Sequence, residues 1–184
     1  MKMLVDETVP GTDVSFNQEE TNWQMAADTD GVRPGFIRWT QHPWKDSQRV
    51  LNWDKATNAW VVLKAPYIVY VPGVAGQLQG EFFTEDFEQT VGQYNGELPP
   101  QVDLELFPID WDALKIMFEW LDFWAKVKAG CYTGAWVLQV ALLYIDRLPD
   151  WFVERDFWLT GYNDEGPDLV SGYDLAVKFW QRTS

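Results

Sequence analysis

The segment from Pro99 to Pro108 sets the strictest limits on how this chain can fold. It reads Pro-Pro-Gln-Val-Asp-Leu-Glu-Leu-Phe-Pro, so apolar and acidic residues alternate between bounding prolines. Successive side chains of a strand point to opposite faces, and the alternation therefore predicts a strand with Asp103 and Glu105 on one face. Their Cα atoms would lie roughly 6.5–7 Å apart.

Two carboxylates at this spacing suit acid–base chemistry. Crowding two like charges tends to raise the pKa of one carboxyl, which allows one to be protonated while its neighbour is ionised. The alternative is an ordinary amphipathic edge strand with a solvated acidic face, and an isolated Val-Asp-Leu-Glu would favour it. Here the segment lies mid-chain among other strand–helix units and precedes a long apolar helix. We therefore expect Asp103 and Glu105 to face the mouth of a barrel.

Apolar periodicity and turn residues predict strands that alternate with helices along the whole chain. Besides the acidic segment, the predicted strands are residues 9–16, 35–40, 66–71, 130–134, 156–162 and 176–181. The predicted helices are residues 23–27, 46–60, 82–94, 111–128 and 135–144. Asn22, Asp46 and Asp110 are candidate N-caps, and Gly130 is expected to end the helix 111–128. This order indicates an α/β fold with a mostly parallel sheet, best fitted by a small or incomplete barrel with its site at the C-terminal strand ends.

Composition limits the class of protein and its partners. The chain has 184 residues, of which 47% are hydrophobic, so a single globular domain over residues 1–184 is expected. A net charge of -14 argues against nucleic acid and anionic membrane as partners, and against a strongly cationic lysozyme that adsorbs to cell walls. No apolar run approaches a membrane span. The first residues turn acidic before any apolar core, so we expect a soluble chain made without a signal peptide.

Three individual residues, Cys131, His42 and Arg38, exclude or suggest particular kinds of site. The only cysteine, Cys131, excludes an intrachain disulfide and a multi-cysteine zinc site, and is expected to be a buried thiol. The only histidine, His42, lies in a Gln-His-Pro-Trp loop and is expected at the surface or rim. Arg38 is charged within an apolar strand, so it is expected to pair with a carboxylate in the barrel interior or mouth. Neither of the glycine-rich nucleotide-binding motifs is present, so nucleotide binding has no support.

Seven short motifs, in a characteristic order and spacing, are distributed along nearly the whole chain. They are Asp13-Val14-Ser15, Phe36-Ile37-Arg38 with Thr40, Asp46 with Asn52 and Ala56, Val102-Asp103-Leu104-Glu105, Tyr132-Thr133-Gly134, Trp158-Leu159 with Tyr162, and Trp180-Gln181. In these motifs the chain resembles the family 25 glycoside hydrolases. That is the lysozyme (N-acetylmuramidase) family often found among phage endolysins and bacterial autolysins. Order and spacing, rather than any single motif, carry the resemblance.

The resemblance implies an irregular, TIM-like (β/α) barrel with incomplete helices. It implies cleavage of the β-1,4 bond between N-acetylmuramic acid and N-acetylglucosamine in peptidoglycan. By motif, Glu105 would be the general acid, Asp103 would orient or polarise the acetamido group or act as second carboxylate, and Asp13 would line the same pocket. The implied substrate-binding residues are Arg38, Tyr70, Tyr132, Tyr162 and Trp180. Tyr70 is chosen in preference to Tyr67. No metal or organic cofactor is implied, and the partner would be the glycan strands of a bacterial cell wall, reached from a host cytoplasm or from a virion.

Two departures from the family pattern leave other hypotheses open. The chain stops at Arg182-Thr183-Ser184, before a final strand that in the family carries an Asp followed closely by Asn. One pocket carboxylate and one closing strand are therefore expected to be absent or supplied differently. The third predicted strand also lacks the family's histidine. The second hypothesis is a non-catalytic glycan-binding or structural barrel module of a phage or cell-wall protein, and the third is a barrel hydrolase for another polysaccharide.

Overall fold

The structure, a computed structural model, describes residues 12–17, 21–29, 34–59, 61, 63–94, 98–160 and 170–181. Its strands are β1 (Thr12–Val14), β2 (Pro34–Gln41), β3 (Trp44–Lys45), β4 (Leu63–Val69), β5 (Gln101–Asp103), β6 (Gly130–Gly134), β7 (Asp156–Thr160) and β8 (Ala176–Gln181). Its helices are α1 (Trp23–Thr29), α2 (Arg49–Asn58), α3 (Gly76–Thr90), α4 (Trp111–Ala125), α5 (Ala135–Ala141) and α6 (Asp150–Val153).

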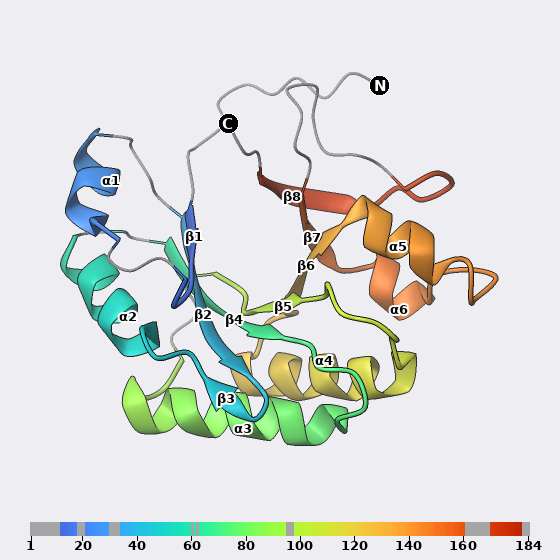
Figure 1. Cartoon of the computed structure of the whole chain (residues 1–184), viewed down its shortest axis with the longest axis horizontal. Coiled ribbons are helices and arrows are strands. Elements are labelled where there is room, and N and C mark those ends of the chain that lie inside the picture. Colours follow the sequence, from blue (N-terminus) through green and yellow to red (C-terminus); the bar gives the residue numbers. More distant parts are fainter. Residues whose placement is uncertain are drawn as a thin grey trace.

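The strands form one curled sheet in the order β1-β2-β4-β5-β6-β7-β8, and β3 pairs with β2 at the side. Neighbours along the main path are parallel, whereas β3 is antiparallel to β2. The sheet makes an open half-barrel with helices packed around its outside (Figure 1). The predicted α/β fold with an irregular, TIM-like barrel is confirmed.

The pairing register aligns several of the candidate site residues across the sheet. Arg38 on β2 lies beside Tyr67 on β4. Asp103 on β5 lies between Val69 on β4 and Tyr132 on β6. Directly paired residues point to the same side of a sheet, so these five side chains share the inner face of the half-barrel.

A small aromatic cluster fills the inside of the half-barrel. Phe36 stacks on Trp158 with ring centroids 4.1 Å apart, and Tyr132 packs edge-on against Trp158 at 4.4 Å. The buried members of the cluster are Phe36, Ala65, Tyr67, Val69 and Trp158. Phe36 precedes Arg38 by two residues on the same face and so lies one layer below it, whereas Tyr67 and Val69 lie level with Arg38 and Asp103.

Helices α3 and α4 lie side by side beneath the sheet (Figure 1), and two glycines allow their close approach. A Cβ on Gly76 would overlap the carbonyl group of Ala113. A Cβ on Gly80 would come 2.8 Å from the ring of Trp120. The missing side chains therefore let α4 pack directly against the α3 backbone.

Several sequence predictions agree with the structure. Strands β6 and β8 have the predicted bounds. Asn22 caps α1 by accepting a hydrogen bond from the backbone N–H of Met25 at 3.0 Å. Asp110 caps α4 by accepting from the N–H groups of Asp112 and Ala113, both at 3.0 Å. Short polar side chains at these positions satisfy helix N–H groups that lack a partner within the helix.

Other boundaries differ from the predictions. Helix α3 begins at Gly76, six residues earlier than predicted, because Gln79 in its polar first turn is buried and hydrogen-bonds the backbone of Val71. Asp46 is not the N-cap of α2, since the cap residue is Gln48. Gly130 does not end α4, which stops at Ala125, and it opens β6 instead. Strand β3 and helix α6 are too short to show a periodic pattern and were not predicted.

No described helix is both long enough and apolar enough to cross a membrane.

Candidate active site

A cavity of about 200 Å³ opens at the C-terminal ends of the strands. Six strands, or the residues directly after them, supply its lining. The described lining residues are Asp13, Ser15, Asn17, Arg38, Tyr67, Asp103, Glu105, Tyr132 and Trp158. In parallel β/α folds this edge of the sheet is where functional residues gather.

Two of the three cavity carboxylates come from β5 and the residues after it. Asp103 ends the strand and is 7% exposed, whereas Glu105 lies beyond the strand and is exposed. Strand β6 holds the residue between them: the N–H of Leu104 donates to the carbonyl of Tyr132, and the carbonyl of Leu104 accepts from Thr133 Oγ1, both at 2.8 Å. Asp103 and Glu105 therefore face the same cavity, as the alternating sequence predicts.

Burial raises the pKa of all three carboxyl groups in the cavity. The pKa of Asp103 lies well above its ordinary value because of burial, to which the charges of Glu105 and Asp13 add and which Arg38 opposes. Burial also raises the pKa of Asp13, with a backbone hydrogen bond in opposition. The pKa of Glu105 is raised by burial and then by the charge of Asp13. The cluster can therefore retain a proton that a surface carboxylate would lose.

Arg38 pairs with a carboxylate, as predicted, and that carboxylate belongs to Asp46. Arg38 Nε donates to Asp46 Oδ2 at 2.9 Å. The other Asp46 contacts fix this carboxylate, because it also accepts from the N–H groups of Phe16 at 2.8 Å and Gln48 at 2.9 Å. Arg38 Nη2 is buried and has no hydrogen-bond partner among the described residues. Asp46 thus holds the guanidinium of Arg38 through Nε, and the Arg38 side chain also lines the cavity.

Tyr67, not Tyr70, is the β4 tyrosine that reaches the cavity. The hydroxyl of Tyr70 accepts a hydrogen bond from the backbone N–H of Asp110 at 2.9 Å, and its ring is fully buried in the main core. Burial and then the negative charges of Asp103 and its carboxylate neighbours raise the pKa of Tyr67. Strand β4 is buried on both faces, so its sequence contains no alternation that would indicate which tyrosine faces inward.

The remaining predicted substrate-binding residues have different placements. Tyr132 lines the cavity. Tyr162 lies outside the described residues, and Trp180 belongs to β8, where its backbone pairs with Leu159. Trp158 lines the cavity but was not among the predicted site residues, although its position within a predicted strand was a usable signal.

Ser15 and Asn17 also line the cavity and were not predicted. Both follow β1 and lie at the same strand edge as Asp13, and the Ser15 hydroxyl accepts from the N–H of Asn17 at 3.3 Å. Residues that follow a strand of a parallel sheet are candidates for such a site on topology alone.

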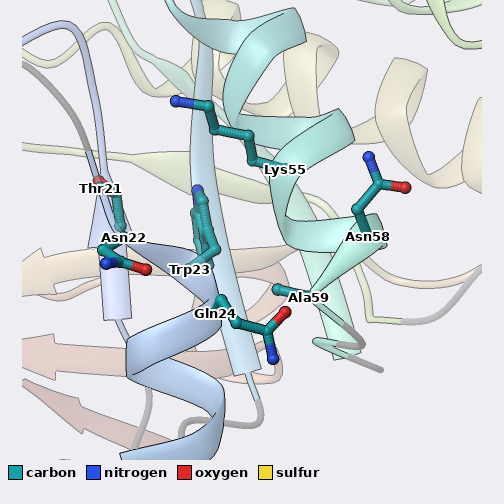
Figure 2. A pocket seen from close by; sticks show the side chains of 7 residues that line it. All are labelled: Thr21, Asn22, Trp23, Gln24, Lys55, Asn58 and Ala59. Atoms are coloured by element: carbon teal, nitrogen blue, oxygen red, sulfur yellow. The ribbon is translucent and has the colours of Figure 1, made fainter.

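A second cavity, of about 340 Å³, lies between α1 and α2 (Figure 2). Its described lining residues are Thr21, Asn22, Trp23, Gln24, Lys55, Asn58 and Ala59. Lys55 is the one charged group of this lining, and Asn22 is already engaged in capping α1. It contains no pair of titratable groups, so it offers less chemistry than the smaller carboxylate cavity.

Within the described part of the chain, no group of three or more His, Cys, Asp or Glu side chains could hold a metal ion. Cys131 is fully buried, as predicted, and burial raises the pKa of its thiol. His42 packs edge-on against Phe82 with ring centroids 5.3 Å apart and is not part of the cavity lining.

Comparison with known proteins gives matches in structure only. No protein-family model matches the chain, and no curated protein matches it in sequence. A family 25 glycosyl hydrolase from Bacillus anthracis superposes with a TM-score of 0.73 at 22% identity, covering 94% of this chain and 78% of that one. A bacterial lysozyme from Streptomyces coelicolor superposes with a TM-score of 0.77 at 19% identity, covering 97% and 85%.

A third match is the modular autolysin LytC from Streptococcus pneumoniae, solved in complex with a synthetic peptidoglycan ligand. It superposes with a TM-score of 0.69 at 16% identity, covering 94% of this chain and 42% of the autolysin. Together these matches show that the chain has the fold of family 25 lysozymes and muramidases.

Proposed function

On the fold of the family 25 muramidases, we propose that this chain hydrolyses the β-1,4 bond between N-acetylmuramic acid and N-acetylglucosamine in peptidoglycan. The observation that carries the proposal is the meeting of Asp13, Asp103 and Glu105 in one cavity where burial raises all three pKa values. Glycosidic hydrolysis needs a protonated carboxyl beside a second polar or charged group. The peptidoglycan ligand of the pneumococcal autolysin supports the substrate class.

Glu105 is proposed as the general acid. It is the most exposed of the three carboxyls, so a glycosidic oxygen can approach it. Its raised pKa favours the protonated form that must be present before the leaving oxygen takes the proton. A bound sugar that excludes water would raise this pKa further, because it removes solvent from the carboxyl.

Asp103 is proposed to orient the acetamido group of the substrate. Asp103 lines the cavity, and its Oδ1 has no hydrogen-bond partner among the described residues, so the carboxyl retains hydrogen-bonding capacity for a ligand group. The acetamido oxygen would attack the anomeric carbon while the leaving oxygen takes the proton of Glu105. The Glu105 carboxylate would then accept a proton from the water that opens the intermediate.

Asp13 and Arg38 are proposed to set the electrostatics around this pair. The charge of Asp13 raises the pKa values of Asp103 and Glu105, whereas Arg38 lowers that of Asp103. Tyr67 and Tyr132, which also line the cavity, would contact the sugar ring.

The test is a digest of purified peptidoglycan with the parent protein and Glu105→Gln, followed by identification of the new reducing-end sugar. We expect muramic acid ends from the parent and none from Glu105→Gln. The matched control is Glu119→Gln on α4, a side chain that is 61% exposed and outside the cavity, which should cleave like the parent.

Each other outcome changes the assignment. Cleavage by a folded Glu105→Gln protein would remove Glu105 as the acid. New glucosamine ends would keep a glycosidase but move the cleaved bond. No new ends from a folded parent protein that still binds peptidoglycan would favour the non-catalytic glycan-binding module.

A further inference from the structure

Two exposed aromatic side chains, Phe107 and Trp136, meet near the cavity and are called the rim pair here. Phe107 is 36% exposed and Trp136 is 54% exposed. Their ring centroids lie 6.2 Å apart with an interplanar angle of 52°. Large aromatic side chains usually bury most of their surface, so an exposed contact between two of them is a candidate binding surface.

Both members of the rim pair follow cavity-lining residues closely in the chain, although neither is part of the lining. Phe107 comes two residues after Glu105, which lines the cavity. Trp136 comes two residues after β6, and its indole folds back over the end of that strand. A Cβ on Gly134 would lie 2.6 Å from the indole Nε1 and 3.0 Å from Thr160 Oγ1 on β7. The indole therefore lies over the C-terminal strand ends, where the cavity opens.

The size of the cavity requires a polymeric substrate to extend beyond it. Its volume of about 200 Å³ is below the roughly 300–1,000 Å³ of sites that enclose a drug-sized ligand. A glycan strand held at one bond would therefore continue over the rim. The rim pair consists of two uncharged aromatic rings, whose faces can pack on the C–H face of a sugar ring.

We propose that Phe107 and Trp136 bind a sugar ring of the same glycan strand, next to the part that enters the cavity. This inference rests on the proposed function, because it takes the cavity's occupant to be a glycan. The two residues bind and position, and they transfer no proton. They give the protein its preference for long strands over short fragments.

The test measures binding in a Glu105→Gln background, so that the glycan is not consumed. The probes are peptide-free glycan strands prepared from peptidoglycan, and the disaccharide of N-acetylmuramic acid and N-acetylglucosamine. We expect Trp136→Ala to weaken strand binding roughly tenfold, or about 1.4 kcal/mol, and to leave disaccharide binding unchanged. Trp136→Phe should keep most of the strand affinity, whereas Trp136→Leu should behave like Trp136→Ala, because a flat ring rather than apolar volume is needed.

The matched control is Phe123→Ala on α4, an 84% exposed aromatic outside the cavity lining, which should bind strands like its parent. Unchanged strand affinity in Trp136→Ala would overturn the inference. So would an equal loss for strand and disaccharide with a lower unfolding temperature, because Trp136 would then support the fold. A concentration-dependent dimer that Trp136→Ala abolishes, with glycan affinity unchanged, would assign the rim pair to self-association.

Failure of the inference can be told from failure of the proposed function. If the parent protein binds strands without cleaving peptidoglycan, and Trp136→Ala loses that binding, glycan binding by the rim pair is supported and the hydrolase proposal is overturned. If the parent protein cleaves peptidoglycan and Trp136→Ala binds strands as well as its parent does, the hydrolase proposal is supported and glycan binding by the rim pair is overturned. Absence of any strand binding overturns the rim pair directly.

Discussion

Asp86 and Asp103 are both nearly closed to water, at 4% and 7% exposure, yet their pKa values move in opposite directions. Asp86 on α3 lies near the surface beneath two cations. Arg49 donates to both of its oxygens, at 2.6 and 3.1 Å, and Lys45 Nζ lies 2.5 Å from Oδ1. Burial by itself would raise the pKa of Asp86, but the hydrogen bonds from these two cations outweigh it and lower the pKa.

Asp103 has the opposite surroundings. Burial raises its pKa most, the charges of Glu105 and Asp13 raise it further, and Arg38, whose Nε is bound to Asp46, opposes them. Two aspartates of similar low exposure therefore differ in pKa. Cations that bind the carboxylate lower the pKa of Asp86, whereas burial and neighbouring carboxylates raise that of Asp103. A buried acid without its own cation is costly to the fold, which is typical of functional sites.

The largest expected effect is a difference in hydrolysis rate between the Asp103 and Asp86 variants. Asp103→Asn should lower the rate of reducing-end release roughly a hundredfold or more, because the amide cannot replace the carboxyl in the cavity. Asp86→Asn should change the rate by less than about twofold once both proteins are folded, because Asp86 lies outside the cavity lining. Initial rates on purified peptidoglycan measure both. Equal losses in the two variants would show that Asp103 is no more important for activity than Asp86.

The next effect separates them by stability. Asp86→Asn should lower the free energy of unfolding by about 2–3 kcal/mol, because Arg49 loses a charged partner in a partly closed site. The loss stays below that of a fully buried pair because the Lys45 side chain is 41% exposed and can be hydrated. Urea unfolding gives the value. The control is Asp150→Asn, which breaks an exposed pair with Arg147 and should change stability little.

A third effect is the pH dependence of stability, with opposite signs. The raised pKa of Asp103 means that its contribution is fully present below its ordinary pKa of 3.8 and is lost as pH rises through the raised value. Asp103→Asn should therefore unfold at a higher temperature than the parent at pH 7, and the gain should vanish in acid. Unfolding temperatures across pH measure this, and a gain that persists below pH 3.8 would contradict it.

For Asp86 the lowered pKa reverses the sign. Its contribution is fully present above the ordinary value of 3.8 and is lost as pH falls through the lowered one. The stability deficit of Asp86→Asn should therefore shrink in acid. The same series of unfolding temperatures tests this, and a deficit that grows as pH falls would show that the two cations do not control this carboxyl.

The smallest effect tests Arg38, the described cation that lowers the pKa of Asp103. Arg38→Gln removes the charge that lowers the pKa of Asp103, so that pKa should rise further. Carbon-13 NMR titration of the Asp103 carboxyl would detect the shift, with the Asp86 carboxyl as an internal reference that should not move. A lower pKa of Asp103 in Arg38→Gln would mean that Arg38 acts through the fold rather than through its charge.

Local chemistry made several parts of the fold predictable. Asp110 caps α4 because a short acidic side chain next to a helix start bonds its free N–H groups wherever the helix packs. Strand alternation placed Asp103 and Glu105 in one cavity even though the regular strand ends at Asp103, since Leu104 remains hydrogen-bonded to β6. The expected cation–carboxylate pair at Arg38 followed from its place in an apolar strand.

Other features needed partners that are distant in sequence. The choice between Tyr67 and Tyr70 depended on which face of β4 turns inward, and a strand buried on both faces does not show this. The early start of α3 depended on Gln79 bonding the loop before it. Trp158 became a wall of the cavity through the register of β7 beside β6.

The alternation of the longer strands and helices, the caps at Asn22 and Asp110 and the shared face of Asp103 and Glu105 could be predicted from the sequence, because these depend on neighbours within a few residues. The tertiary structure alone decided which carboxylates are crowded and which are neutralised. Burial raises the pKa of both Asp86 and Asp103. Arg49 and Lys45 outweigh this effect at Asp86, whereas Glu105 and Asp13 add to it at Asp103. Electrostatic interactions act through space and depend on burial, so they are settled only when the strands have come together.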